Sequence, residues 1–336
     1  MPCAAEVDDC LSGAQFMHRP GPKKDREIPV ENSQFSTIST GFSTGLFHRR
    51  PMIRIRLVLL LSVGIFFGQM LKGQTNHSEG GCIPTRSLEV GSLAFGDGEH
   101  FRFTMHYSWG VINSDVGSAT VDLKKEIFNG EDVFHCSVSG RTTRLFDLFF
   151  KVREDFQSWF RCDGLRPLKF TRDTHEGKYT AKNKYIYVWD APAPYIAADV
   201  YSTSLGQRNL LLPLNACTYD LPALFYLARN MDFDSVIPGE RHPMTFAIDD
   251  EVYNVYFILH GRETIKVKGL GTVKTIRFAA KLLAGEVFTG EEDMIIWVTD
   301  DDNRIPVYFE APILVGTASG RLAEYSGLRH PFDSLL

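Results

Sequence analysis

The sequence predicts a mainly β protein, an antiparallel curved sheet or barrel over residues 99–330 with one or two helices that plug it. The first observation is the strict alternation in His100–Trp109, where aromatic residues and Met alternate with polar residues. A period of two is typical of a half-buried strand. The second observation is that similar runs recur at close spacing, and the third is the turn residues between them, as at Asn129–Gly130 and Asp163–Gly164.

The other predicted strands show either a period of two or a high content of β-branched and aromatic residues. They cover Ala119–Phe128, Val133–Ser139, Asp155–Arg161, Pro167–Thr174, Tyr179–Trp189, Met244–Ile248, Val252–His260, Thr264–Lys268, Val273–Leu282, Met294–Thr299 and Pro306–Glu310.

Two segments are predicted to be helical. In the first, residues 220–232, Asp220 is a candidate N-cap and Pro222 lies in the first turn. Its apolar stripe should pack on the sheet. It consists of Leu221, Leu224, Phe225, Ala228 and Met231. The second is the short segment Leu145–Phe150, which is apolar on nearly every side except at Asp147, so it is either a buried plug or an exposed tip.

The domain contains an apparent internal repeat, with halves at 99–215 and 240–330 joined by the helix at 220–232. The interpretation aligns Trp159 with Trp297 on strands that lead into turns containing Asp, and it predicts that both indoles are buried. The other aligned pairs, with one residue inserted, are Asp163 with Asp302, Arg166 with Arg304, Pro167 with Pro306 and Phe170 with Phe309.

The N-terminal part resembles an export signal. Met52 starts a segment with Arg54 and Arg56, an apolar run and a polar exit, which is the layout of a cleaved signal peptide over 52–73. We therefore expect residues 1–51 to be an upstream or disordered segment and 74–98 to be a flexible lead. The predicted location is the periplasm.

Composition limits the possible partners. The formal charge of −5 argues against a nucleic-acid partner, because such proteins usually present a basic face. Four of the six cysteines follow the signal segment, and in an oxidising compartment they permit three pairings. They are Cys82, Cys136, Cys162 and Cys217, and the spacing does not select a pairing.

The stretch GFSTG at Gly41–Gly45 matches the G-x-S-x-G nucleophile elbow, but the strand before it and the helix after it that this motif needs are not predicted. The histidines are dispersed, and no C-x-x-C pair is present, so neither a metal site nor a cofactor is expected. Acidic runs at Asp249–Glu251 and Asp300–Asp302 lie between predicted strands, where Asp commonly stabilises turns. The alternative is a hydrolase of envelope polysaccharide that uses these carboxylates as an acid–base pair.

The stretch GEHFRFTMHYSW, with Gly117 after it, and the ending WVTDDDNRIPVYFEAPILVGTASGRLAEYSGL carry a family resemblance. Over most of residues 96–330 the chain resembles a bacterial envelope family, domain of unknown function 3108, in its Bacteroides-group form. The main features are Arg304, Pro306 and Val307 after an acidic turn, and Gly316 beyond them. The resemblance implies an exported, mostly antiparallel β protein without an established activity, with a pattern similar to lipoprotein carriers or lipocalins.

The predicted function is therefore binding rather than catalysis. Abundant aromatic residues on strand faces favour a hydrophobic cavity, groove or tip that takes an apolar small molecule, a lipid or a lipoprotein. Arg141, Arg144, Lys151 and Arg153 flank the apolar tip, which also favours peripheral contact with a membrane. The candidate ligand-binding residues are Leu145, Phe146, Phe149, Phe150, Trp159, Trp297 and Tyr187.

Overall fold

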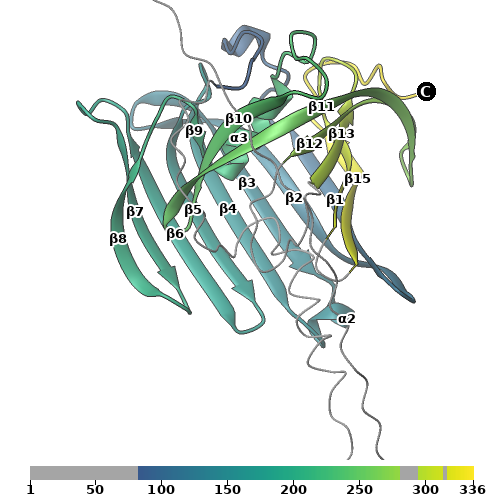
Figure 1. The fold of residues 1–336 in the computed structure, drawn as a ribbon, viewed down its shortest axis with the longest axis horizontal. Helices are drawn as coiled ribbons and strands as arrows, with labels where there is room; N and C mark the ends of the chain where they lie inside the picture. Colours follow the sequence, from purple (N-terminus) through teal and green to yellow (C-terminus); the bar gives the residue numbers. More distant parts are fainter. Residues whose placement is uncertain (1–81, 281–293, 313–315) are drawn as a thin grey trace, which may run out of the picture. The chain divides into compact units, whose positions relative to one another are not determined.

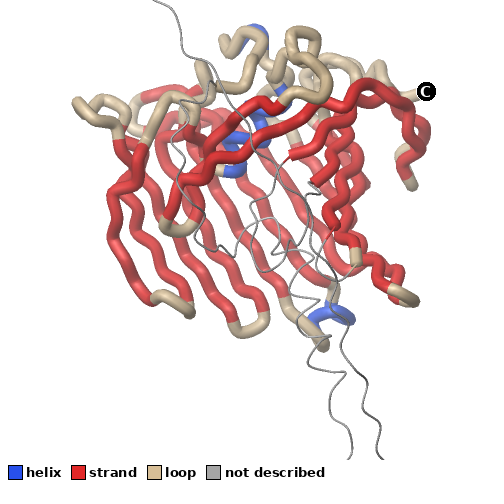
Figure 2. The backbone as a smooth tube through the Cα atoms, in the orientation of Figure 1, coloured by secondary structure: helices blue, strands red, loops and turns tan. Residues whose placement is uncertain are grey.

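A single sheet contains all fifteen strands of the described chain (Figures 1 and 2). The structure is a computed structural model that describes residues 82–280, 294–312 and 316–336. The expectations for residues 1–51, for the signal segment 52–73 and for the first part of the flexible lead, residues 74–81, lie outside this range. The rest of that lead, residues 82–98, is packed against the domain, contrary to the expectation, because Leu93 and Phe95 are fully buried in the main core. The strands are β1 (His100–Trp109), β2 (Ile112–Phe128), β3 (Glu131–Thr142), β4 (Val152–Arg161), β5 (Pro167–Glu176), β6 (Tyr179–Val188), β7 (Tyr195–Ser202), β8 (Gly206–Pro213), β9 (Thr218–Tyr219), β10 (Arg241–Ile248), β11 (Glu251–Val267), β12 (Gly271–Ala280), β13 (Met294–Thr299), β14 (Pro306–Pro312) and β15 (Thr317–Ser326).

The order of the strands is β8-β7-β6-β5-β4-β3-β2-β1-β15-β14-β13-β12-β11-β10-β9. The chain runs as a meander from β1 out to β8, starts again at the opposite edge with β9, and returns to β15, which pairs with β1. All neighbours are antiparallel except β9 and β10. The prediction of a mainly β protein built on a curved antiparallel sheet is confirmed, and the sheet is not closed into a barrel.

In the described ranges three short helical segments accompany the sheet: η2 (Val90–Ser92), α2 (Arg144–Asp147) and α3 (Leu221–Arg229). None of the helices in the described ranges combines the length and the apolar character needed to cross a bilayer. Helix α3 packs against β3 and β4 and also against β10, so it lies between distant parts of the same sheet (Figure 1).

The start of α3 follows the predicted chemistry. Asp220 is the N-cap, and its Oδ1 accepts a hydrogen bond of 2.9 Å from the backbone N–H of Ala223. Pro222 lies in the first turn, where its missing N–H costs nothing. The helix ends at Arg229, and Asn230 is the C-cap.

The predicted apolar stripe of α3 is not its most buried face. Leu221, Leu224, Phe225 and Ala228 are only partly buried. The buried helix residues are Pro222, Ala223, Tyr226, Leu227 and Arg229, and Met231, just beyond the helix, is also buried. Because strands approach this helix from more than one side, burial there does not follow a single stripe.

Arg229 fixes the end of α3 to the sheet. Its guanidinium forms a buried ion pair with Glu99 that includes a hydrogen bond of 2.8 Å from Nη2 to Oε1. It also donates from Nε and Nη2 to the carbonyl oxygen of Asn303, at 3.0 and 2.9 Å. A buried charge needs such complete pairing, because desolvation is otherwise very costly.

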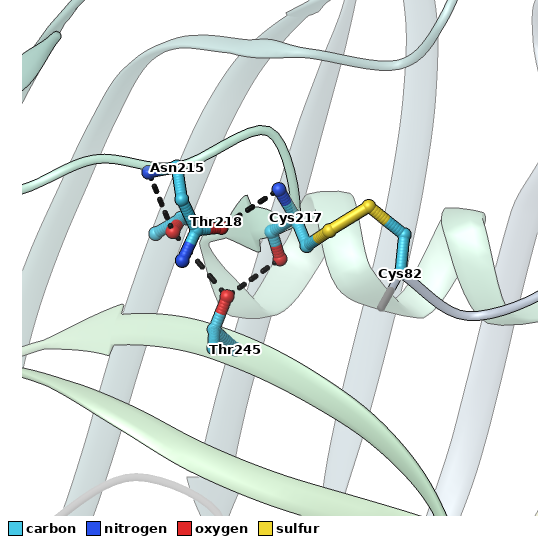
Figure 3. Close-up of a disulfide and its surroundings, with 5 residues drawn as sticks. All are labelled: Cys82, Asn215, Cys217, Thr218 and Thr245. Carbon is cyan, nitrogen blue, oxygen red and sulfur yellow. Dashed lines mark hydrogen bonds between the residues drawn. A yellow bond between two sulfur atoms is a disulfide. The ribbon is translucent and has the colours of Figure 1, made fainter. Parts of the chain in front are cut away.

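A disulfide joins Cys82 to Cys217, immediately before α3 (Figure 3). It selects one of the pairings that the sequence leaves open, and Cys136 and Cys162 are buried thiols. From Cys82 the chain continues along α3 to its other end, where the N–H of Arg86 donates to the carbonyl of Asn230 at 2.9 Å. Residues 82–86 therefore form a strap over α3, covalently fixed at one end and hydrogen-bonded at the other.

The Asp220 cap is expected to make stability depend on pH. Burial raises the pKa of Asp220 to about 7, although Ser158 donates to its Oδ2 at 2.8 Å. The unfolded pKa is about 3.9, so the folded state binds the proton more tightly. The stabilisation is present at acidic pH and is lost as the pH rises through about 7. Asp220→Asn keeps the cap and should flatten the decline in unfolding free energy between about pH 4 and pH 7 in urea titrations.

Asp333→Asn provides the control for this prediction, because Asp333 is exposed. Its pH profile should match that of the unmodified protein. An unchanged slope in Asp220→Asn would show that another group controls the pH dependence.

Candidate functional site

The segment predicted as a short apolar helix lies at the α2 end of the sheet and divides into an exposed and a buried part. Leu145, Leu148 and Phe149 are 66%, 79% and 62% exposed, and we call these three residues the α2 tip. Phe150 is buried, and Phe146 is partly buried and packs against the small cluster of Phe150 and Val152. Of the two possibilities that the sequence leaves open, the structure therefore matches an exposed tip with buried anchors.

Hydrogen bonds and an ion pair hold the α2 tip in place. The side chain of Thr143 caps α2 by accepting from the N–H of Phe146. Arg153 donates two hydrogen bonds to Asp147, at 3.0 and 2.5 Å, and this contact lowers the pKa of the carboxyl group. Thr142 also donates to Asp147 at 2.5 Å. The α2 tip is thus held in place by the hydrogen-bonded group of Thr142, Asp147 and Arg153, which we call its base.

The surroundings of the α2 tip are basic. Residues 141–153 contain Arg141, Arg144, Lys151 and Arg153 against the single acid Asp147, which is a local charge of +3 in a chain with a formal charge of −5. Arg141, Arg144 and Lys151 are exposed, whereas Arg153 is used by Asp147. The combination of exposed apolar groups and free cationic groups is typical of surfaces that contact acidic amphiphiles.

The other predicted site residues lie in separate clusters. Trp297 is buried in the main core and packs on Tyr308, with ring centroids 5.2 Å apart. Tyr187 is buried in a second cluster, and burial raises the pKa of its hydroxyl group well above the usual value. The structure does not bring these two side chains to the α2 tip.

Trp159 is only partly buried, contrary to the expectation for it. Its neighbours Ser158 and Phe160 are the inward-facing residues of β4, so the strand alternation turns Trp159 to the other face. There His135 stacks on the indole at 4.2 Å, and the Nζ of Lys169 lies 4.0 Å from the ring centroid. This tryptophan is already covered by its neighbours.

Trp159 and Trp297 nevertheless make the same kind of contact, in which the indole N–H donates to a glutamate. Trp159 Nε1 donates to Glu126 at 2.6 Å, and Trp297 Nε1 donates to Glu263 at 2.7 Å. In each case the acceptor lies two strands away, on β2 or β11, and each of these strands has 17 residues. The interpretation of two similar halves accounts for these parallels.

A buried polar cluster that the sequence did not predict lies on the inward face of β4 and β5. Glu154, Arg172 and Glu176 are buried at inward positions of these strands, alternating with outward residues. Burial raises the pKa of both glutamates, that of Glu176 further, and each has one buried oxygen without a described hydrogen-bond partner. The contact with Glu154 adds to the rise in the pKa of Glu176 that burial causes. The sequence does carry a signal for this cluster. Glu154, Arg172 and Glu176 are separated by an even number of residues from Phe156 or Phe170, so strand alternation places these charged residues on the same buried face.

The same cluster holds the turn between β10 and β11. Arg172 donates to Asp249 at 2.6 Å, and Arg208 donates to Asp250 at 2.7 Å. A pocket of about 100 Å³ lies beside these two ion pairs. Two of the three carboxylates of this run, those of Asp249 and Asp250, are therefore each paired with an arginine. A catalytic pair would be separated by about 5 to 10 Å across a cleft.

The other acidic turn is also structural. Asp300 contacts Arg304 and Arg262, while Asp301 accepts from Thr299 at 2.7 Å and from the backbone N–H of Asn303 at 3.0 Å. These contacts hold the turn between β13 and β14. They correspond to the turn-stabilising role that Asp commonly has.

Comparisons with known proteins give a family and a similar fold. A search of curated proteins found no match. Among solved structures, the chain is similar to a β-barrel-like protein of domain of unknown function DUF1849 from Brucella abortus, with 9% identity and a TM-score of 0.46. That alignment covers 69% of this chain and 98% of the other. The profile of the family described as "Protein of unknown function (DUF3108)" matches residues 102–323, and the chain belongs to this family.

Proposed function

We propose that this chain is an exported envelope protein that binds a hydrophobic, lipid-like group at the α2 tip. The observation that carries the proposal is that Leu145, Leu148 and Phe149 are exposed on a base that is itself fixed by the Asp147–Arg153 ion pair. Side chains held outward in this way lose little conformational freedom on binding. Clustered exposed apolar residues usually mark a site for a partner or for a membrane.

The disulfide supports export. A Cys82–Cys217 bond is stable in oxidising compartments such as the periplasm and is rare in the cytosol. This observation agrees with the signal-like segment that begins at Met52. The proposed location is therefore the periplasm.

Binding should weaken when the exposed apolar groups are removed. Leu148→Ser combined with Phe149→Ser should reduce the affinity for dansyl-labelled undecanoic acid by about tenfold or more, since each buried apolar side chain contributes about 1.5 to 3 kcal/mol. Fluorescence titration of the full chain measures the effect. Circular dichroism should remain that of the β-sheet, because both side chains are exposed.

Ile127→Ser is the matched control, because Ile127 is 75% exposed at the far end of β2. Its affinity for the probe should not change. Equal affinities for the tip variant and the unmodified chain would exclude the α2 tip as the binding site. Phe146 is not used in the test, because it packs on Phe150 and its replacement would disturb the base of the tip.

A further inference from the structure

A second apolar projection lies at the turn between β1 and β2. Trp109 is 40% exposed, and Val111 is fully exposed. Gly110 between them has a φ of 55°, which glycine adopts without the strain of a side chain. We call Trp109, Gly110 and Val111 the β1–β2 finger. The alternation of β1 predicts an inward Trp109, but the indole lies at the last position of the strand, where the covered part of the sheet ends.

The fold does not require an apolar turn at this position. The hairpin between β2 and β3 turns through Asn129–Gly130, which is polar and has positive φ values at both residues. In the interpretation of two similar halves, the counterpart of the finger is the turn Asp249–Asp250, which is acidic. The turn at Val111 is therefore apolar where these two turns are polar.

The finger and the α2 tip lie at the same end of the sheet (Figure 1). β2 pairs with β3 up to Gly117 and Thr142, and beyond this pair the N–H of Thr143 still donates to the carbonyl of Val116 at 2.9 Å. Helix α2 begins at the next residue, while β2 starts at Ile112, next to the finger. The finger thus lies directly before β2 and the α2 tip directly after β3, and these two strands are neighbours in the sheet.

The charges at this end favour an acidic partner. Arg141, Arg144 and Lys151 are exposed beside the tip, and Lys178 is exposed in the turn between β5 and β6. Asp115, the acid near the finger, is paired with Arg321 at 2.6 Å, and this contact lowers the pKa of its carboxyl group. Its negative charge is therefore largely compensated.

We propose that this end of the sheet docks on an anionic lipid bilayer through two apolar contacts, the α2 tip and the β1–β2 finger, with the exposed cations at the headgroups. The inference rests on the proposed function, for which it names the partner. Trp is favoured at the boundary between headgroups and acyl chains, where its ring is apolar and its N–H remains hydrated. Exposed Arg and Lys next to such groups add attraction to anionic headgroups.

Binding to vesicles should depend on Val111. The full chain should co-sediment with vesicles of phosphatidylcholine and phosphatidylglycerol, and less with phosphatidylcholine alone. Val111→Asp should reduce binding to the mixed vesicles at least about tenfold, because an apolar contact is lost and a repelling charge is added. Ile127→Asp places the same charge on another exposed residue, at the far end of β2, and should bind as the unmodified chain does.

Quenching by brominated lipids provides a second measurement that does not depend on a disruptive change. The tryptophan fluorescence of the unmodified chain should be quenched when the chain binds vesicles that contain brominated lipids. Trp109→Phe should bind the same vesicles but lose most of this quenching. Trp297 is buried and Trp159 is covered by His135 and Lys169. Trp189 stacks on Tyr187 just after β6, at the end of that strand away from Lys178, so these three indoles should contribute little. Unchanged quenching in Trp109→Phe would overturn the proposed role of the finger.

The outcomes separate this inference from the proposed function. Full vesicle binding by Val111→Asp, with reduced binding of the dansyl probe by the α2 tip variant, overturns docking through the finger and leaves the proposed function intact. Loss of vesicle binding in Val111→Asp and in the α2 tip variant, with Ile127→Asp unaffected, is the expected result. Equal binding to mixed and to pure phosphatidylcholine vesicles overturns the role of the cations.

Discussion

Arg229→Met is expected to lower the unfolding free energy by about 3 to 5 kcal/mol, because it leaves the buried carboxylate of Glu99 without its partner. The variant also removes two donors from the carbonyl of Asn303, which lies in the turn between β13 and β14. The end of α3 would then lose its attachment to both the β1 side and the β14 side of the sheet. Urea unfolding followed by circular dichroism measures the change.

The double variant Glu99→Leu with Arg229→Met tests the cause. If the uncompensated charge is responsible, removing both partners should recover a large part of the lost stability. Arg241→Met is the control, because Arg241 is exposed, and it should change stability by less than about 0.5 kcal/mol. If Arg229→Met proved as stable as Arg241→Met, the role assigned to Arg229 would be wrong.

Removing the disulfide should have an effect of similar size. Cys82→Ser combined with Cys217→Ser opens a loop with a sequence separation of 135, for which chain entropy predicts a loss of about 4 to 5 kcal/mol. The strap over α3 would be retained only by backbone hydrogen bonds such as that from Arg86 to Asn230. The midpoint of urea unfolding is the measurement.

A reducing agent supplies the internal comparison for the disulfide. Reduction should shift the unmodified chain to the stability of the double variant, and it should not shift the double variant itself. The thiols Cys136 and Cys162 are present in both proteins and are buried, so they do not distinguish the samples. A double variant that unfolds at the same urea concentration as the oxidised chain would contradict this prediction.

The sequence identifies most of the strands whose alternation reflects one buried face, and it misses several others. β15 was missed because small residues interrupt its pattern: a Cβ at Gly320 would lie 2.0 Å from the ring of Phe309, so that ring requires a glycine opposite it. β8 was missed because it is an edge strand without inward alternation. β7 was also missed, although Ile196, Ala198 and Val200 alternate inward.

The candidate site was found only in part, for a physical reason. The composition of Leu145–Phe150 shows that some apolar groups must remain outside, since a single short helix cannot bury all sides. Which groups remain outside depends on Asp147, whose partner Arg153 on β4 fixes the orientation of α2. The finger at Val111 was not identified, because the sequence alone does not show how far the β1–β2 turn projects beyond its neighbours.

β15 pairs with β1 in the middle of the sheet, so the strands cannot join the sheet in the order in which they are synthesised. β1 can pair with β2 early, but its other edge has no partner until the C-terminal strand has been made. Strands that are far apart in the sequence pair slowly, because the entropy of closing the long loop is lost before the new contacts stabilise the pair. During that interval the edge of β1, rich in Phe and Tyr, is open to pairing with other chains. A chain built in this way depends on being kept apart from its own copies until it is complete.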